Sequence, residues 1–310
     1  MGTADNAPQG PFDIAVIGAG VVGCAVARQA TLGGARTVVI EKADDILDGA
    51  SKGNSAILHT GFDAPVGSLE QRLVARGYEI YRAIHDRLRL PLLKTGAMVL
   101  AWSVEDAERL GGLIEKAHQN GVADVRPLTR ADILAREPGV SQDVVAGILV
   151  PGEHIIDPWT APFAYLLQAI QNGAAVMRSA EVTGGRFNGQ AWTLTTTKGA
   201  VRAATVVNCA GLYGDRVDQI LTGESAFEIR PRKGEFLVFD KAAANVLTTT
   251  LLPVPSETTK GIVVCRTIYG NVLVGPTAQE QESREDASVD TATLERLKAT
   301  AARLVPALGQ

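Results

Sequence analysis

The residues with the clearest chemical meaning in this sequence are three glycines in a G-x-G-x-x-G pattern, Gly18, Gly20 and Gly23. In such a pattern the first glycine permits a tight turn out of a strand, and the second lets the backbone approach a pyrophosphate group. The third lets the next helix pack closely on the strand, so that the helix N-terminus directs its N–H groups at the phosphates. The spacing therefore predicts a dinucleotide site, and a purely structural role in packing is the alternative.

The segments around these glycines favour the dinucleotide interpretation. The apolar run 14–17 is typical of a buried parallel strand, and the residues from about Val21 to Leu32 predict a helix. A second apolar run, 37–40, is followed by Glu41, eighteen residues after the third glycine. A carboxylate at that position can accept hydrogen bonds from ribose hydroxyls. Strand, turn, helix, strand and acid in one short stretch are much more specific than the glycines alone.

Length and composition indicate a soluble globular protein of two domains. The chain has 310 residues, of which 46% are hydrophobic and 21% charged. Its net charge of −4 gives no reason to expect a nucleic-acid partner. No apolar run reaches the roughly 18 residues that span a bilayer, and residues 1–11 have no secretory signal. We therefore expect a cytoplasmic protein with a mobile N-terminal tail and no transmembrane segment.

Cysteine and histidine usage argues against a metal site or a disulfide framework. The three cysteines, Cys24, Cys209 and Cys265, are far apart in sequence and have apolar neighbours, so we expect reduced, buried thiols. The sequence has four histidines, and no cysteine or histidine pair has the spacing of metal ligands.

The order of elements favours FAD over a nicotinamide cofactor. A nicotinamide-dependent dehydrogenase normally continues strands and helices in alternation. Here the hairpin dipeptides Asn188-Gly189 and Lys198-Gly199 predict an antiparallel meander within 183–202, after which the buried strand 204–209 resumes the dinucleotide-binding half. Residues 229–276 then predict short strands of a second, antiparallel sheet. The other predicted elements are strands at 97–102, 144–150 and 174–177 and helices at 69–90, 104–119, 129–137 and 159–172.

Six motifs occur in a characteristic order: the glycine pattern, Glu41-Lys42, ASKGNSAILHTG at 50–61, VPGEHIIDPWT at 150–160, VVNCAGLYGDRV at 206–217 and PRKGEFLVFD at 231–240. Together they resemble the FAD-dependent oxidoreductases of the D-amino-acid oxidase and glycerol-3-phosphate dehydrogenase type. Within that group the sequence most resembles the branch of L-2-hydroxyglutarate oxidase and the anaerobic glycerol-3-phosphate dehydrogenase large subunit. The resemblance extends from about Phe12 to the C-terminus.

The resemblance implies which residues contact FAD. The glycine turn, including Ala19 and Val22, would hold the pyrophosphate, Glu41 the adenosine ribose, and Lys42 the neighbouring phosphate or adenine edge. Gly53 departs from the pattern, because relatives usually carry Arg there, so a phosphate contact from that side chain is not expected. The other implied contacts are Ser51, Asn54 and Ser55 beside the pyrophosphate and ribityl chain, the backbone of Val182 at the adenine, and Ala210 and Gly211 at a strand end.

His59 matches the histidine beside the flavin ring in these enzymes. A neutral imidazole there could take the proton of a substrate hydroxyl as hydride leaves for flavin N5. Two alternatives stay open: a histidine that only hydrogen-bonds the flavin or the backbone, and a covalent link to FAD as in some distant relatives. We expect His154, in a turn before Asp157-Pro158, to be a surface residue without a functional role.

An acidic substrate calls for a cationic partner, and a guanidinium binds carboxylate or phosphate in a bidentate manner. Arg232 and Arg266 are the predicted substrate-binding members of the catalytic set, with Arg230 and Lys233 as further candidates in the same predicted sheet. A solvated position on a strand is the alternative for each of them.

These observations predict a two-domain α/β flavoprotein whose Rossmann-type FAD-binding domain, 12–90 and 150–225, is discontinuous in sequence. An antiparallel-sheet substrate domain would comprise 91–149 and 226–310. The expected reaction is oxidation of a small, acidic secondary alcohol, a 2-hydroxy acid such as L-2-hydroxyglutarate or glycerol 3-phosphate, by hydride transfer to FAD. The electron acceptor would be oxygen, a quinone or a partner subunit. The alternatives are an amino-acid or amine oxidase of the same fold, and a non-catalytic FAD-binding subunit or fragment.

The end of the sequence is the last distinctive feature. It predicts a helix with Leu294, Leu297, Ala301 and Leu304 on one face. The resemblance implies a further segment after this helix that completes the substrate domain and the flavin site. We therefore expect this chain to bind FAD weakly and to turn over slowly or not at all.

Overall fold

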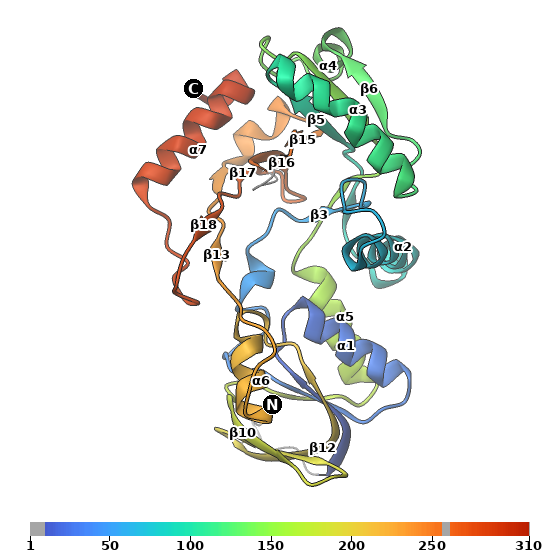
Figure 1. Cartoon of the computed structure of the whole chain (residues 1–310), viewed down its shortest axis with the longest axis vertical. Helices are drawn as coiled ribbons and strands as arrows, with labels where there is room; N and C mark the ends of the chain where they lie inside the picture. Colours follow the sequence, from blue (N-terminus) through green and yellow to red (C-terminus); the bar gives the residue numbers. More distant parts are fainter. Residues whose placement is uncertain (1–9, 256–260, 310) are drawn as a thin grey trace. The chain divides into compact units, whose positions relative to one another are not determined.

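The computed structural model describes residues 10–255 and 261–309. The chain folds into two compact units, each assembled from separated segments (Figure 1). The first unit comprises the chain up to Asn54 together with Pro158–Pro231 and Gln281–Arg284. The second unit comprises Ser55–Asp157, Arg232–Glu280 and the chain from Glu285 onward.

The first unit is built on a six-stranded sheet with the strand order β10-β11-β12-β1-β2-β9. The strands β12, β1, β2 and β9 run parallel, whereas β10, β11 and β12 form an antiparallel meander. The long strand β12 belongs to both parts, because it pairs with β1 on one side and β11 on the other. The strands are β1 (Pro11–Ile17), β2 (Thr37–Ile40), β9 (Ala175–Met177), β10 (Val182–Phe187), β11 (Trp192–Thr196) and β12 (Gly199–Asn208).

Helices cover both faces of this sheet. Because successive strand residues point to opposite faces, Val16 of β1 packs with Cys24 of α1 and Leu166 of α5. The next residue, Ile17, packs on the other face with Val217 of α6. This layered arrangement confirms the predicted Rossmann-type domain that is discontinuous in sequence. The helices are α1 (Val21–Leu32), α5 (Thr160–Gln171) and α6 (Gly214–Thr222).

The second unit is built on a seven-stranded sheet with the order β14-β17-β16-β15-β5-β7-β6. Its neighbouring strands are antiparallel except for β15 and β5, which run parallel. The sheet is therefore mixed, whereas the sequence predicted a purely antiparallel one. The strands are β5 (Ala97–Ala101), β6 (Arg126–Thr129), β7 (Ala146–Val150), β14 (Leu237–Phe239), β15 (Thr250–Pro253), β16 (Val263–Arg266) and β17 (Val272–Gly275).

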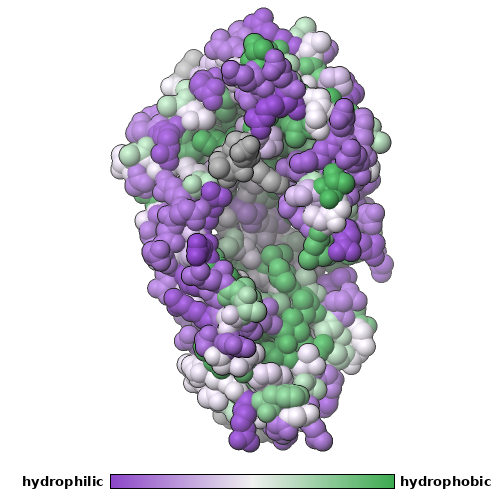
Figure 2. All heavy atoms as spheres, viewed as in Figure 1, coloured by the Kyte–Doolittle hydropathy of each residue, from purple (hydrophilic) through white to green (hydrophobic). Residues whose placement is uncertain are grey.

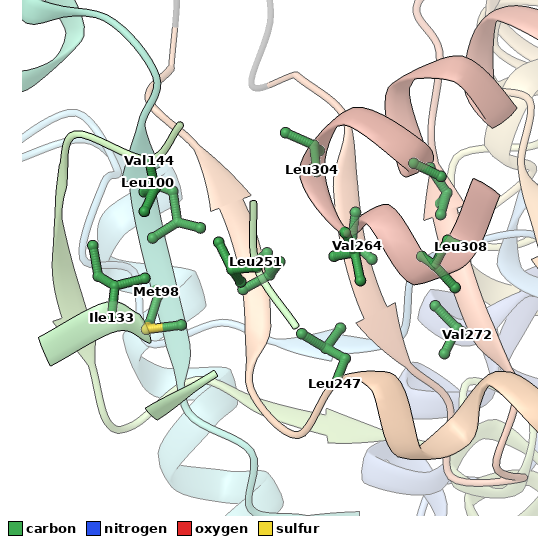
Figure 3. Packing of buried hydrophobic residues seen from close by; sticks show 14 of the residues in the cluster. Met98, Leu100, Ile133, Val144, Leu247, Leu251, Val264, Val272, Leu304 and Leu308 are labelled. Carbon is green, nitrogen blue, oxygen red and sulfur yellow. The ribbon is translucent and has the colours of Figure 1, made fainter. Parts of the chain in front are cut away.

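Two buried clusters hold this sheet to its helices. Figure 3 shows part of one cluster, in which Met98 of β5 packs in the same core as Ile133 of α4 and Leu304 of α7. The neighbouring Val99 faces the other side and packs in a second cluster with Leu110 of α3. The helices of this unit are α2 (Leu69–Leu88), α3 (Val104–Gln119), α4 (Arg130–Arg136) and α7 (Thr291–Leu304).

The second unit also contains a two-stranded antiparallel sheet, β13-β18, and a small three-stranded sheet, β3-β8-β4. Its central strand β8 pairs antiparallel with β3 on one side and β4 on the other. The remaining strands are β3 (Ile57–Leu58), β4 (Leu92–Leu93), β8 (His154–Ile156), β13 (Arg232–Lys233) and β18 (Gln279–Glu280), and the 3₁₀ helices are η1 (Ala50–Lys52), η2 (Gly211–Tyr213), η3 (Lys241–Val246) and η4 (Pro306–Gly309).

This small sheet shifts the boundaries that the sequence predicts. Residues 55–90 and 150–157, assigned above to the FAD-binding domain, belong to the second unit. The physical reason is that β3 and β4 share hydrogen bonds with β8, which keeps all three strands in one compact body. Residues 226–231 and 281–284, assigned to the substrate domain, belong instead to the first unit.

The N-terminal strand starts earlier than predicted, because Pro11 already belongs to β1. Residues 1–9 of the predicted tail lie outside the described residues.

Hydrophilic residues cover much of the face seen in Figure 2, and apolar patches interrupt them. In the part of the chain that the structure describes, no helix combines the length and apolar character needed to cross a membrane.

Candidate functional site

The glycine turn lies where β1 ends and α1 begins, beside the end of β12. Gly18 has a φ of +101°, a conformation that L side chains rarely adopt, and a Cβ there would collide with the carbonyl of Cys209. A Cβ at Gly23 would collide with the carbonyl oxygen of Gly18. Both positions therefore require glycine for the strand ends and the helix to approach each other this closely.

Glu41 holds the glycine turn in place. Its Oε2 accepts a hydrogen bond of 2.7 Å from the backbone N–H of Ala19, and its Oε1 accepts one of 2.9 Å from Ala43. The carboxylate thus lies at the carboxyl end of β2, next to the turn, where a dinucleotide ribose binds in Rossmann-type proteins.

Ser51 connects a later loop to the start of α1. Its Oγ accepts a hydrogen bond of 3.0 Å from the N–H of Val21, and a Cβ added to Gly20 would lie only 3.1 Å from the same Oγ. A hydroxyl that accepts in this way keeps its own hydrogen to donate to a phosphate oxygen. Asn54 orders this loop, since its Nδ2 donates to the carbonyl of Ser51 at 2.9 Å.

The remaining cofactor candidates divide between the two units. Val22 is 61% exposed at the N-terminal turn of α1, and the ammonium of Lys42 lies 3.3 Å from the ring centroid of Tyr213. Val182 is buried at the start of β10, Ala210 and Gly211 lie at the start of η2 just after β12, and Ser55 belongs to the second unit.

The first unit fits a dinucleotide cofactor on its own geometry. The N-terminus of α1, a serine hydroxyl and a turn of small residues form a cradle that a Cβ at Gly20 would narrow. The carboxylate of Glu41 lies beside this cradle, so phosphate and ribose contacts have separate partners.

In the second unit, strand register brings His59 opposite Glu153. Ile57 pairs with Ile155, and Leu58 pairs with His154, so the next antiparallel pair is His59 with Glu153. The Nδ1 of His59 lies 2.7 Å from Oε2 of Glu153. The side chain of Glu153 is 0% exposed, whereas that of His59 is 42% exposed.

Glu153 lies within the motif at 150–160, but no role was predicted for it. Only the pairing of β3 with β8 shows that Glu153 lies opposite His59. These strands have two and three residues and are about a hundred positions apart, so the sequence alone does not predict how they pair. The same pairing corrects the expectation for His154, which is buried in the structure rather than at the surface. Burial lowers the pKa of His154, because it disfavours the charged imidazolium.

His59 and Arg232 line one cavity of about 380 Å³ in the second unit. Arg232 lies on β13, and its Nε pairs with a carboxylate oxygen of Glu280 at 2.9 Å. Apolar side chains such as Phe62 and Leu252 supply much of the remaining wall. The cavity therefore combines a titratable imidazole and a guanidinium in largely apolar surroundings.

The other cationic candidates lie elsewhere. Arg266, on β16, is not among the residues that line this cavity, and its Nε is buried without a hydrogen-bond partner in the described parts of the chain. Arg230 is exposed and pairs with Glu228, while Lys233 pairs with Asp286. Of the predicted catalytic set, the structure thus brings together His59 and Arg232 but not Arg266.

The cysteines are not candidates for reactive residues. Cys24 and Cys265 are buried as expected, and burial raises the pKa of both thiols to about 12. Cys209 is only half-buried, which differs from the prediction. Among residues 10–255 and 261–309, no group of three or more potential ligands could hold a metal ion.

A glycine turn at the carboxyl ends of parallel strands, with an acid after the next strand, defines a dinucleotide-binding protein of the Rossmann type. Comparison with known proteins gives the family. The chain belongs to the FAD-dependent oxidoreductase family, whose model matches residues 13–310. The family resemblance inferred from the motifs is therefore confirmed, and with it FAD as cofactor.

Individual relatives are similar along most of the chain. A glycerol 3-phosphate dehydrogenase from Caloramator mitchellensis is 34% identical over 269 residues, which is 87% of this chain and 56% of that protein. A glycerol 3-phosphate oxidase from Mycoplasma pneumoniae is 28% identical over 88% of this chain and 73% of its own length. An L-2-hydroxyglutarate dehydrogenase from Escherichia coli K12 is 29% identical over 88% and 65%, respectively.

A solved structure supports the same fold. Dithionite-reduced L-α-glycerophosphate oxidase from Mycoplasma pneumoniae with FAD bound superposes with a TM-score of 0.87 at 25% identity, covering 96% of this chain and 79% of that one. Glycine oxidase from Geobacillus kaustophilus has the same fold, with a TM-score of 0.87 at 23% identity over 97% of this chain and 80% of its own. The chain spans little more than half the length of the Caloramator relative.

Proposed function

We propose that this chain takes part in the FAD-dependent oxidation of a small acidic secondary alcohol, glycerol 3-phosphate or a 2-hydroxy acid. The observation that carries the proposal is the cavity shared by His59 and Arg232. An imidazole can accept the hydroxyl proton, and a guanidinium can bind the phosphate or carboxylate of the same substrate. The relatives named for glycerol 3-phosphate and L-2-hydroxyglutarate support this substrate class.

The first unit supplies the residues that would hold the cofactor. The N–H groups at the start of α1 and the Ser51 hydroxyl would bind the pyrophosphate, and Glu41 would bind the adenosine ribose. When bound, FAD supplies the acceptor for the hydride that leaves the substrate carbon. Lys42, Asn54, Ala210 and Gly211 are proposed as further contacts on the resemblance alone.

The second unit supplies the residues for the substrate. His59 would take the hydroxyl proton, and only four residues separate it in sequence from Asn54, the last residue of the first segment of the FAD-binding unit. Arg232 would bind the acidic group in competition with Glu280. The largely apolar wall of the cavity would limit the water around the reacting group.

The experiment is anaerobic reduction of the FAD-loaded protein by glycerol 3-phosphate, L-2-hydroxyglutarate and glycine in separate stopped-flow runs. We expect one of the two hydroxy compounds to bleach the flavin absorbance. Reduction by glycine alone would show instead an amine oxidase of the same fold, and reduction by none of the three would contradict the proposal. Reoxidation of the reduced protein by oxygen or by a soluble quinone then identifies the electron acceptor.

A matched pair of arginine variants tests the assignment of the acidic group. Arg232→Gln should raise the KM for the acidic substrate, because the cavity loses its guanidinium. Arg230→Gln is the control, since Arg230 is exposed, pairs with Glu228 and does not line the cavity. Equal effects of the two substitutions would show that Arg232 acts only through overall charge.

A further inference from the structure

We infer that Glu153 is a positioning residue that holds His59 in the Nδ1–H tautomer and so makes Nε2 the atom that accepts the substrate proton. The inference rests on the proposed function, in which His59 is the general base. It concerns a residue for which neither the motifs nor the resemblance implied a role.

Hydrogen-bond donors of Thr60 surround one oxygen of Glu153. Its Oε1 accepts two hydrogen bonds from Thr60, one from the N–H at 2.6 Å and one from the hydroxyl at 2.7 Å. The Thr60 hydroxyl in turn accepts from the N–H of Phe62 at 3.3 Å, so its hydrogen is directed to Glu153. An ionised carboxylate has no hydrogen to donate. With Glu153 ionised, the contact of 2.7 Å at Oε2 places the hydrogen on Nδ1 of His59.

This arrangement decides which ring nitrogen can act as a base. In a neutral imidazole one nitrogen donates and the other accepts, so a hydrogen fixed on Nδ1 leaves the lone pair on Nε2. The substrate O–H bond would break with its proton passing to Nε2, while the hydride on the same carbon passes to FAD and the alcohol becomes a carbonyl. The imidazolium that forms keeps its Nδ1–H on the buried, negatively charged Glu153, which stabilises it.

Glutamine at position 153 should reverse the tautomer for a specific reason. The two donors of Thr60 select an oxygen, so the amide oxygen of the glutamine would take the place of Oε1. Its NH₂ group would then face His59, where it can only donate. Nδ1 of His59 would become the acceptor and the hydrogen would move to Nε2. Glu153→Gln thus changes the tautomer while nearly preserving the size of the side chain.

The first readout is independent of activity. Nuclear magnetic resonance of the FAD-loaded protein, labelled with ¹⁵N in its four histidines, reports the tautomer of each ring, and His59→Gln assigns the signal of His59. We expect Nδ1–H in the wild type and Nε2–H in Glu153→Gln. A wild-type ring with its hydrogen on Nε2, or an unchanged tautomer in the variant, would overturn the inference.

The second readout is the rate of anaerobic flavin reduction. General-base catalysis contributes ~10²–10⁴-fold, and we expect Glu153→Gln to lose most of that factor with little change in substrate affinity. Because both residues act through one proton transfer, the double variant with His59→Ala should be no slower than His59→Ala alone. Additive losses in this cycle would contradict the inference.

Glu137→Gln is the matched control. Glu137 is also a buried carboxylate of the second unit, and it accepts hydrogen bonds from the backbone N–H groups of Thr248 and Thr249 and from the Thr248 hydroxyl. Its substitution should reduce stability in a similar way but leave the His59 tautomer and the rate unchanged. If Glu153→Gln does not fold, Glu153→Asp replaces it: a carboxylate retained at this position should keep hydrogen on Nδ1, and an Nε2–H ring would count against the inference.

The two proposals fail separately. If His59→Ala leaves flavin reduction unchanged, the base assignment of the proposed function is wrong, whereas the tautomer measurement still decides whether Glu153 orients the ring. If His59→Ala slows reduction but Glu153→Gln changes neither the tautomer nor the rate, the base assignment stands and the role of Glu153 is refuted.

Discussion

Substituting Gly20 by valine should remove FAD binding without unfolding the first unit. The φ of Gly20 is −71°, which valine can adopt, so the backbone of the turn is not strained by the change. A Cβ at this position would lie 3.1 Å from the Oγ of Ser51, and valine carries two further methyl groups on that Cβ. The hydroxyl would have to leave its hydrogen bond with the N–H of Val21, and the valine would occupy the space through which a phosphate approaches the helix N-terminus.

The size of the effect follows from the contacts that are lost. A hydrogen bond to a charged group contributes ~1.5–3 kcal/mol, so losing two phosphate contacts should weaken FAD binding by roughly 10²–10⁴-fold. The assay is titration of the apoprotein with FAD, followed by quenching of flavin fluorescence, together with circular dichroism to show that the fold is retained.

Gly112→Val is the control for this experiment. Gly112 lies on α3 of the second unit, and nothing lies within 4 Å of the position that its Cβ would take. We expect the control to bind FAD like the wild type. A folded Gly20→Val protein that retains wild-type affinity would refute the assignment of the glycine turn as the pyrophosphate site.

Three further predictions concern the acid beside the turn, the core of the second unit and its acid stability. Glu41→Gln should weaken FAD binding by about 10-fold, because a hydrogen bond to the charged carboxylate contributes roughly 1.5 kcal/mol or more and the neutral amide loses this contribution. Titration of the apoprotein with FAD measures the change in affinity. Leu297→Ala should lower the free energy of unfolding by ~2–5 kcal/mol, since Leu297 is 0% exposed in the core between α7 and the sheet, and urea denaturation checks it. Asp215 pairs with Arg284 at 2.6 Å, and the hydrogen bonds from this guanidinium hold the pKa of the carboxyl well below its usual range. The pair therefore stabilises the fold fully above the ordinary aspartate pKa near 4, and this contribution is lost as the pH falls through the lowered pKa. Asp215→Asn removes the titrating group. The midpoint of thermal unfolding should therefore depend less steeply on pH in this variant than in the wild type between about pH 5 and pH 2.

The sequence alone determined the first unit and its cofactor chemistry. The glycine turn, α1 and β2 are contiguous, and Gly23 is needed because of the carbonyl of Gly18, only five residues away. Gly18 and Gly20 instead lie close to Cys209 and Ser51, which are distant in sequence. Local patterns also placed the hairpins and the helix α4, at whose start Thr129 and Asp132 bond to each other in a capping box. The long β12 was nevertheless predicted as two strands, because buried and exposed residues alternate in its antiparallel half but not in residues 204–208.

Only the tertiary structure decided how the second unit brings its residues together. The strands β3 and β8 have two and three residues, too short for a recognisable period, and their pairing crosses about a hundred residues. That pairing moved residues 55–90 out of the predicted FAD-binding domain and set His59 opposite the buried carboxylate of Glu153. Likewise, the sequence predicts Arg232 and Arg266 equally as substrate-binding residues, and only the folded second unit distinguishes the one that lines the cavity from the one that does not. Contacts between distant segments depend on register and packing across the whole unit, and a local pattern of residue types carries no information about either.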